Sequence, residues 1–173
     1  STQQEILLPD QSKVILAPGS SLIYFATKQE RQVELHGSSF FTVKRDVDKP
    51  FKIKSKELLI SVLGTAFEVT QSKSKNKVAV SSGRVMVHYE NDSLVMQKGD
   101  GFIWDKNRQS MKSFKNMRGI QEGWHSNRLT FSNEKLENVL DLLAFRFDVD
   151  FKAKNQELVH CEISGNFSMD NIE

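Results

Sequence analysis

The sequence of 173 residues contains a single cysteine, Cys161, which excludes an internal disulfide framework and a metal site built from several thiolates. Positive and negative charges nearly cancel, and a net charge of +2 does not indicate a nucleic-acid partner. There is no apolar run of about 18 residues, the length that a membrane-spanning helix needs. The first residues also lack the basic and apolar regions of a signal peptide. We therefore expect any targeting or membrane segment to lie outside this sequence.

Patterns that carry catalysis or metal binding are missing as well. The sequence has no nucleophile elbow, no phosphate-binding loop and no dinucleotide-binding glycine pattern. Cys161 is interpreted as a small apolar strand residue and not as a reactive thiol. The sequence therefore predicts a protein that is not an enzyme, with no catalytic residues, no metal ligands and no cofactor. The four histidines lack the paired spacing of a metal site: His36, His88, His125 and His160.

What the sequence does contain is a series of short apolar strands. Residues 58–63 are almost all apolar, which predicts a central strand that is covered on both faces. After Gly64 only Phe67 and Val69 stay apolar, two residues apart, as in a half-buried strand. Gly64 with Thr65 indicates a bend or bulge between the two strands. We interpret Gly64, Thr65, Phe67 and Val69 as a structural motif.

A weak copy of this motif lies upstream, where Phe40 follows Gly37 by three residues, as Phe67 follows Gly64. Two copies favour stacked hairpins in one sheet system. Strand and turn signals continue at this spacing from about residue 6 to residue 114, which predicts an all-β sandwich, barrel or solenoid.

Two polar or aromatic groups of the chain have ordinary structural explanations. The three lysines between residues 73 and 77 are typical of a solvated hairpin tip. Trp124 with His125 is interpreted as an anchor for a connector and not as a binding spot.

The period of the pattern changes near residue 129. Residues 129–131 predict a short strand, Ser132 or Asn133 can cap a helix, and residues 149–151 predict a second strand. We therefore divide the chain into an all-β domain (1–118), a connector (119–128) and a β-α-β module (129–173) that we expect to be incomplete at its C-terminus. The helix presents one apolar stripe: Leu136, Val139, Leu140, Leu143 and Phe147. We expect a small core with one uncovered side: Phe131, Leu136, Val139, Leu140, Leu143 and Phe151.

Taken in order, several motifs resemble the periplasmic part of FecR-type transmembrane anti-sigma factors, especially the form common in Bacteroidetes. The most specific of them is Val62-Leu63-Gly64-Thr65-Ala66-Phe67-Glu68-Val69, and others are Leu8 to Val14, Lys49-Pro50-Phe51-Lys52-Ile53 and Ser82-Gly83-Arg84-Val85. The stretch from Leu129 to Phe151, with Ser164-Gly165-Asn166-Phe167, resembles the C-terminal module of that family. This module is similar to the short signalling domain at the N-termini of secretins and TonB-dependent transporters. The chain departs from the family at Gln11, where a turn glycine is usual, and at Ser38-Ser39.

The resemblance implies a FecR-like β domain followed by a signalling module, which together relay a signal. The partners it implies are the signalling domain of an outer-membrane TonB-dependent transporter and, through a cytoplasmic segment outside this sequence, an extracytoplasmic-function sigma factor. It places the chain in the periplasm, anchored to the inner membrane by a helix upstream of residue 1. Neither nucleic acid nor a direct small-molecule substrate is expected. The residues expected to bind protein are Phe131, Val149, Phe151, Gly165, Asn166 and Phe167.

The alternative from another class is a non-catalytic carbohydrate-binding or adhesion β-sandwich. It needs exposed aromatic side chains in one groove, and Trp104 and Trp124 are the candidates. A cupin-like enzyme is less favoured because the sequence lacks a histidine cluster.

Overall fold

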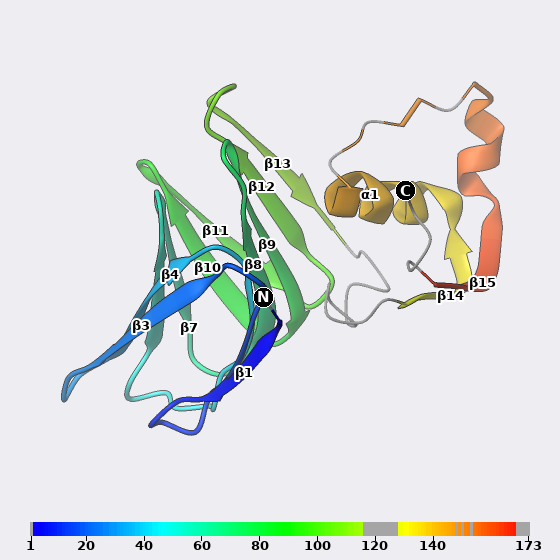
Figure 1. Cartoon of the computed structure of the whole chain (residues 1–173). Coiled ribbons are helices and arrows are strands. Elements are labelled where there is room, and N and C mark those ends of the chain that lie inside the picture. The colour runs from blue at the N-terminus through cyan, green and yellow to red at the C-terminus, as the bar shows by residue number, and fades with distance from the viewer. Residues whose placement is uncertain (1, 116–127, 148, 150, 153, 169–173) are drawn as a thin grey trace.

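The computed structural model describes residues 2–115, 128–147, 149, 151–152 and 154–168. The first range folds into two β-sheets that face each other, and the residues from 128 onward form a smaller unit with one α-helix (Figure 1). The prediction of a mainly β chain followed by a small α+β unit is confirmed, and the sheets form a sandwich. No helix within the described ranges is long and apolar enough to cross a membrane.

Each sheet is assembled from strands that lie far apart in the sequence. Across the seven-stranded sheet the order is β1 (Gln4–Leu7), β2 (Lys13–Leu16), β5 (Ser39–Thr42), β8 (Ala66–Gln71), β9 (Lys75–Ser82), β12 (Gly101–Asp105) and β13 (Ser110–Phe114). Across the six-stranded sheet it is β11 (Asp92–Gln97), β10 (Arg84–Tyr89), β7 (Leu58–Val62), β6 (Phe51–Ser55), β4 (Arg31–His36) and β3 (Ser21–Ala26). The chain therefore crosses between the sheets repeatedly.

Most of these crossings contain a glycine: Gly19, Gly37, Gly64, Gly83 and Gly99 lie where the chain leaves one sheet for the other. Gly64 connects β7 to β8, and a Cβ atom there would lie 2.5 Å from Cα of Arg45. Gly37 connects β4 to β5 with φ of 97°, a conformation that other residues rarely adopt. The internal repeat seen in the sequence is therefore a repeated crossing between sheets.

The core between the sheets is formed by side chains that alternate along the strands. Phe41 and Phe67 are register partners on β5 and β8, both fully buried, with stacked rings whose centroids are 5.3 Å apart. Our repeat paired Phe40 with Phe67, which is wrong by one residue. Because successive side chains of a strand point to opposite faces, Phe40 points away from this core.

The prediction that residues 58–63 are covered on both faces is also wrong. Alternate residues of β7 are buried, but Leu59 and Leu63 are 38% and 41% exposed. They lie on the outer face of the six-stranded sheet and belong to neither hydrophobic cluster of the described residues. A continuous apolar run therefore does not show that both faces of a strand are covered. In β7 the inner face is buried, and the outer face is apolar and exposed.

Both faces are covered instead on β12. Phe102 and Trp104 point into the core between the sheets, whereas Ile103 belongs to a second cluster on the outer face. All five residues of this strand are buried. The outer face of the seven-stranded sheet therefore supports the unit that follows.

A buried ion pair ties the two sheets together at one end of the sandwich. Nη1 of Arg31, at the start of β4, lies 2.7 Å from Oδ2 of Asp10 in the turn after β1. Arg31 also donates to the carbonyl oxygens of Lys44 and Lys49, and Asp10 accepts from Ser12. Because most polar atoms around the pair find partners, the cost of burying its charges is largely offset.

The C-terminal unit consists of β14 (Arg128–Lys135), α1 (Leu136–Phe147), a short 3-10 helix η2 (Gln156–His160) and β15 (Glu162–Ser168). β14 and β15 pair antiparallel, with a bulge between Phe131 and Glu134. The predicted helix caps, Ser132 and Asn133, lie inside β14, so that prediction is wrong. The backbone N–H of Leu136 donates to the carbonyl of Cys161 at 2.8 Å.

Three further sequence predictions for this unit need correction. Val149 and Phe151 belong to no strand. Cys161 is exposed and precedes β15, so it is not an apolar strand residue. The buried residues of α1 are Val139, Leu142, Ala144 and Phe145, whereas Leu136, Leu140 and Leu143 are half-buried and Phe147 is exposed. The buried side chains therefore lie on a different face of α1 from the predicted stripe, because α1 packs against the sandwich as well as against its own strands.

Candidate protein-interaction site

The C-terminal unit packs on the outer face of the seven-stranded sheet through a hydrophobic cluster, which we call the junction cluster. The rings of Phe114, at the end of β13, and Phe145, on α1, meet edge to face with centroids 5.5 Å apart. The small core expected for this unit is therefore shared with the sandwich, and the expected members Leu136, Leu140 and Phe151 are not part of it. The junction cluster comprises Ala79, Ile103, Phe114, Leu129, Phe131, Val139, Leu142 and Phe145.

A lysine from the sandwich holds the last turn of α1. Nζ of Lys77, on β9, donates to the carbonyl oxygen of Phe145 at 2.5 Å and lies 5.5 Å from the centroid of its ring. Carbonyls in the last turn of a helix lack intrahelical partners and carry partial negative charge, so a cation stabilises this end. Lys77 was predicted to lie in a solvated hairpin tip. Of the three lysines there, Lys75 and Lys77 are instead residues of β9.

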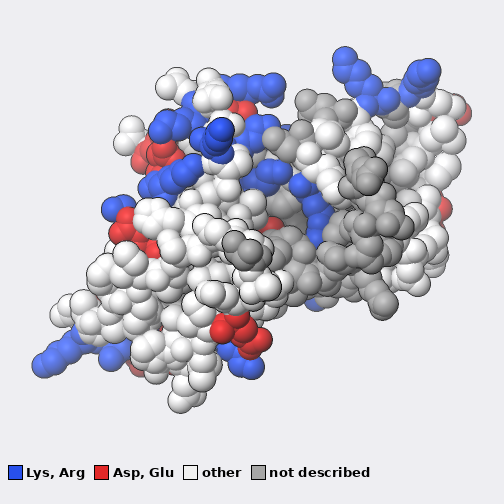
Figure 2. All heavy atoms as spheres, in the orientation of Figure 1, with Lys and Arg blue, Asp and Glu red and all other residues white. Residues whose placement is uncertain are grey.

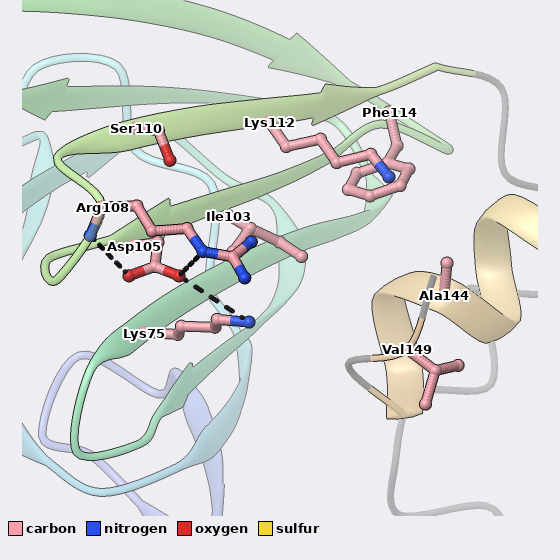
Figure 3. A pocket seen from close by; sticks show the side chains of 9 residues that line it. All are labelled: Lys75, Ile103, Asp105, Arg108, Ser110, Lys112, Phe114, Ala144 and Val149. Atoms are coloured by element: carbon pink, nitrogen blue, oxygen red, sulfur yellow. Dashed lines mark hydrogen bonds and ion pairs between the residues drawn. The ribbon is translucent and has the colours of Figure 1, made fainter. Parts of the chain in front are cut away.

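Beside this contact, a polar pocket of about 210 Å³ separates the β12–β13 hairpin from the end of α1 (Figure 3). Asp105 lies on the sandwich side, with its carboxylate 3.8 Å from Nζ of Lys75 and 3.9 Å from Nε of Arg108. Ala144 and Val149 approach from the helical side. Val149, expected to bind a partner, therefore lines the junction with the sandwich.

Phe131, Gly165 and Phe167 lie together on the two-stranded sheet. Phe131 is opposite Gly165 in the register, and its ring centroid is 5.9 Å from that of Phe167. A Cβ atom on Gly165 would lie 3.1 Å from the Phe167 ring, so the ring covers the glycine backbone. Phe131 is 5% exposed and Phe167 is 51% exposed. Phe167 is thus the member of the group that a partner can reach.

Several large apolar side chains of the C-terminal unit are exposed. Phe151 is 46% exposed and Val149 is 45% exposed. Leu158, on η2, is 53% exposed and was not among the residues expected from the sequence to bind a partner. The exposed set is Phe147, Val149, Phe151, Leu158 and Phe167. Such side chains on a small unit are typical of an interaction surface.

The sheet of this unit also has open edges. It contains only β14 and β15 among the described residues, so each strand has one side without a strand partner. Asn166 is exposed on β15, opposite Thr130. Ser164 and Asn133 bond to each other across the bulge. An open edge beside exposed apolar side chains suits the addition of a strand from a partner.

The residues of the glycine motif make structural contacts. Oγ1 of Thr65 donates to the carbonyl oxygen of Arg84 at 2.8 Å, which joins the β7–β8 corner to β10. Phe67 and Val69 are fully buried in the sandwich core. Gly64 admits the backbone of Arg45, as described above.

The described residues give little support for a metal site, a sugar-binding site or a charged patch of one sign. They contain no group of three or more His, Cys, Asp or Glu side chains that could hold a metal ion. Trp104 is buried beside Tyr89, with ring centroids 5.8 Å apart, so it offers no surface for stacking on a sugar. Trp124 and His125 lie outside the described residues. Figure 2 shows Lys and Arg side chains near the tip of the β12–β13 hairpin, but carboxylates are mixed with them.

Comparison with known proteins decides the family. The family model described as FecR protein matches residues 1–86, and the model described as FecR, C-terminal matches residues 128–173. The chain belongs to the FecR family. The C-terminal FecR model begins at the first residue of β14, so it coincides with the unit described above.

Solved structures agree with this fold. Two crystal structures of a protein from Parabacteroides distasonis ATCC 8503, described as a proposed anti-sigma factor, match with a TM-score of 0.70 and 22% identity. The matches cover 99% and 98% of this chain and 82% of theirs. At this identity the likeness shows the fold alone. No curated protein matches the chain.

Proposed function

We propose that this chain is the periplasmic relay part of a transmembrane anti-sigma factor. The C-terminal unit receives a signal from the signalling domain of an outer-membrane TonB-dependent transporter. The full protein passes it, through an inner-membrane helix and a cytoplasmic segment, to an extracytoplasmic-function sigma factor. Membership of the FecR family supports an anti-sigma-factor-like role, interaction with a sigma factor and regulation in place of catalysis.

The observation that carries the proposal is the surface of the C-terminal unit. Open strand edges on β14 and β15 lie in the same small unit as exposed apolar side chains, and Phe167 is half-exposed at the end of β15. A partner strand added to such an edge gains backbone hydrogen bonds, and the apolar side chains add buried area. No catalytic group is needed for this event.

Within the expected binding residues we assign different roles. Phe167, Asn166 and Phe151 are exposed and form the contact surface. Phe131 and Gly165 position the Phe167 ring, and Val149 lies at the junction with the sandwich. Partner binding at β15 is therefore connected, through Phe131 and the junction cluster, to the seven-stranded sheet. We keep the division into residues 1–118, 119–128 and 129–173 as part of this proposal.

The test uses the full-length protein in its host, with a sigma-factor-dependent reporter and the transporter substrate as inducer. Phe167→Asp places a charge where an apolar contact is needed, and we expect substrate-dependent induction to fall about tenfold or more. Deleting the segment from Leu129 onward should abolish the dependence on substrate. Purified signalling domain should also bind the Phe167→Asp chain more weakly than the original chain.

Leu7→Asp is the matched control, because Leu7 is 66% exposed at the end of β1, away from the C-terminal unit. It should leave induction unchanged. Unaltered substrate-dependent induction in the deletion strain would rule the relay out.

A further inference from the structure

The six-stranded sheet carries a groove of about 790 Å³ on its outer face, on the opposite sheet from the one that supports the C-terminal unit. We call it the corner groove. Ser61, Met86 and Val95 are register neighbours across β7, β10 and β11 and form a row along it. The side chains that define the groove are Arg45, Lys52, Leu63, Arg84, Met86 and Val95.

The corner groove is apolar where an open sheet face is usually polar. Leu63, Met86 and Val95 are 41%, 40% and 56% exposed. Gly64 and Gly83 also line the groove and contribute no side chains, which leaves the apolar row accessible. None of these exposed side chains supports the core of the sandwich. Their grouping in one hollow is typical of a recognition surface.

The charged side chains that line the groove have one sign. Its lining includes Arg45, Lys52 and Arg84 and no carboxylate. Lys52 already pairs with Glu30 at 2.5 Å, but neither arginine has an ion-pair partner among the described residues. Arginine presents a planar fork of donors that matches a carboxylate, so two such groups favour an acidic ligand.

The position of Arg45 is set by the fold. The N–H groups on either side of it, from Val43 and Asp46, donate to the carbonyls of Thr65 and Leu63 at 2.9 and 2.8 Å. The close approach to Gly64 fixes the same segment against the β7–β8 corner. The backbone of Arg45 is thereby fixed against the β7–β8 corner, so its side chain starts from a defined position beside the groove.

We propose that the corner groove binds an extended, acidic segment of a partner protein, with apolar side chains two residues apart and carboxylates between or beside them. The apolar side chains cover Leu63, Met86 and Val95, and the carboxylates pair with Arg45 and Arg84. β11 is the edge strand of the sheet, so the segment can continue along it. This surface is separate from the C-terminal unit and gives the β domain a binding role of its own.

The test is selection of a phage-displayed dodecapeptide library on the purified chain, followed by affinity measurement on the enriched peptides by fluorescence anisotropy. We expect peptides with net negative charge and alternating apolar residues. Arg45→Gln with Arg84→Gln, and separately Leu63→Ser with Met86→Ser, should each weaken binding about tenfold or more. The effect of the arginine pair should shrink in high salt because exposed charges are screened.

Two controls match these variants in chemistry. Ile23→Ser removes an apolar side chain that is 51% exposed at the other edge of the same sheet, and Lys28→Gln with Lys73→Gln removes two exposed cations outside the groove. Both should leave affinity within about twofold. The proposal is overturned if enriched peptides lack acidic residues, or bind the groove variants as well as the original chain. It is equally overturned if no peptide is enriched while laurate binds in an Arg84-dependent way, which assigns the groove to small amphiphilic acids.

Discussion

The two sheets of this FecR-family protein have equally buried inner faces and very different outer faces. On the seven-stranded sheet, Ile103 of β12 is 8% exposed because the C-terminal unit packs over it. On the six-stranded sheet, Leu59 and Leu63 remain more than a third exposed. Outward apolar side chains are therefore core residues on one sheet and exposed residues on the other. The difference is made by the packing of a unit that is distant in sequence.

The largest expected effect compares an inner position, Phe67 on β8, with an outer position, Leu63 at the β7–β8 corner. Phe67→Ala removes a fully buried ring stacked on Phe41, and should lower the free energy of unfolding by about 3–5 kcal/mol. Leu63→Ala, on the open face, should cost less than about 1 kcal/mol. Urea denaturation measures both. Equal costs would mean that the outer face is covered in solution.

A second pair of variants compares the two outer faces directly. Ile103→Ala should cost about 2–3 kcal/mol because it leaves a cavity under α1, whereas Leu59→Ala should cost less than about 1 kcal/mol. Hydrogen exchange should show the α1 amides losing protection in Ile103→Ala and keeping it in Leu59→Ala. In the original chain we expect α1 amides to exchange faster than those of β7. Equal protection would contradict a less stable C-terminal unit.

The packing of the C-terminal unit on the seven-stranded sheet can also be weakened without removing an apolar side chain. Lys77→Met keeps the length of the side chain but removes the donor to the carbonyl of Phe145, and should weaken the docking of α1 by about 1 kcal/mol. The readout is faster exchange at the C-terminal end of α1. Lys73→Met, at an exposed turn position nearby, is the control and should change nothing. A similar effect from both would remove the specific role of Lys77.

The smallest expected effect concerns an ion pair that joins the hairpin tips of the two sheets. Nζ of Lys106 lies 2.6 Å from Oε1 of Glu57, and this hydrogen bond holds the pKa of Glu57 below its ordinary value of 4.5. A lowered pKa means that the stabilisation is present above the unfolded-state pKa and is lost as the pH falls through the folded-state value. Both side chains are partly exposed, so the contribution is under about 1 kcal/mol.

Thermal melts of the original chain and of Lys106→Met, recorded from neutral to acidic pH, measure this contribution. The difference between them should be present at neutral pH and should vanish below the pKa of Glu57. A constant difference over that range would show that Lys106 acts through packing and not through its charge.

Much of the β sandwich was predictable because its signals are local. The alternation of Phe67 and Val69 identified buried strand positions. Gly64 with Thr65 indicated a bend or bulge, but not that the chain passes there from one sheet to the other. The exposed face of β7 was not predictable, since a run of apolar residues looks the same whether its second face is covered or open. In the C-terminal unit, the helix was predictable from its period, but its cap and its buried stripe were wrong. The bulge in β14 and the packing of α1 against Ile103 and Phe114 override the local pattern.

By itself, the sequence determined the strand content, the glycine corners and the family, because these depend on residues that are close along the chain. Only the tertiary structure decided which apolar side chains are buried and which are available. Lys77 donates a hydrogen bond to the last turn of α1, Trp104 is buried in the core, and Arg45 lines the corner groove. Each of these roles depends on contact with a segment far away in the sequence. Burial and charge pairing are set by such contacts, and no local pattern encodes them.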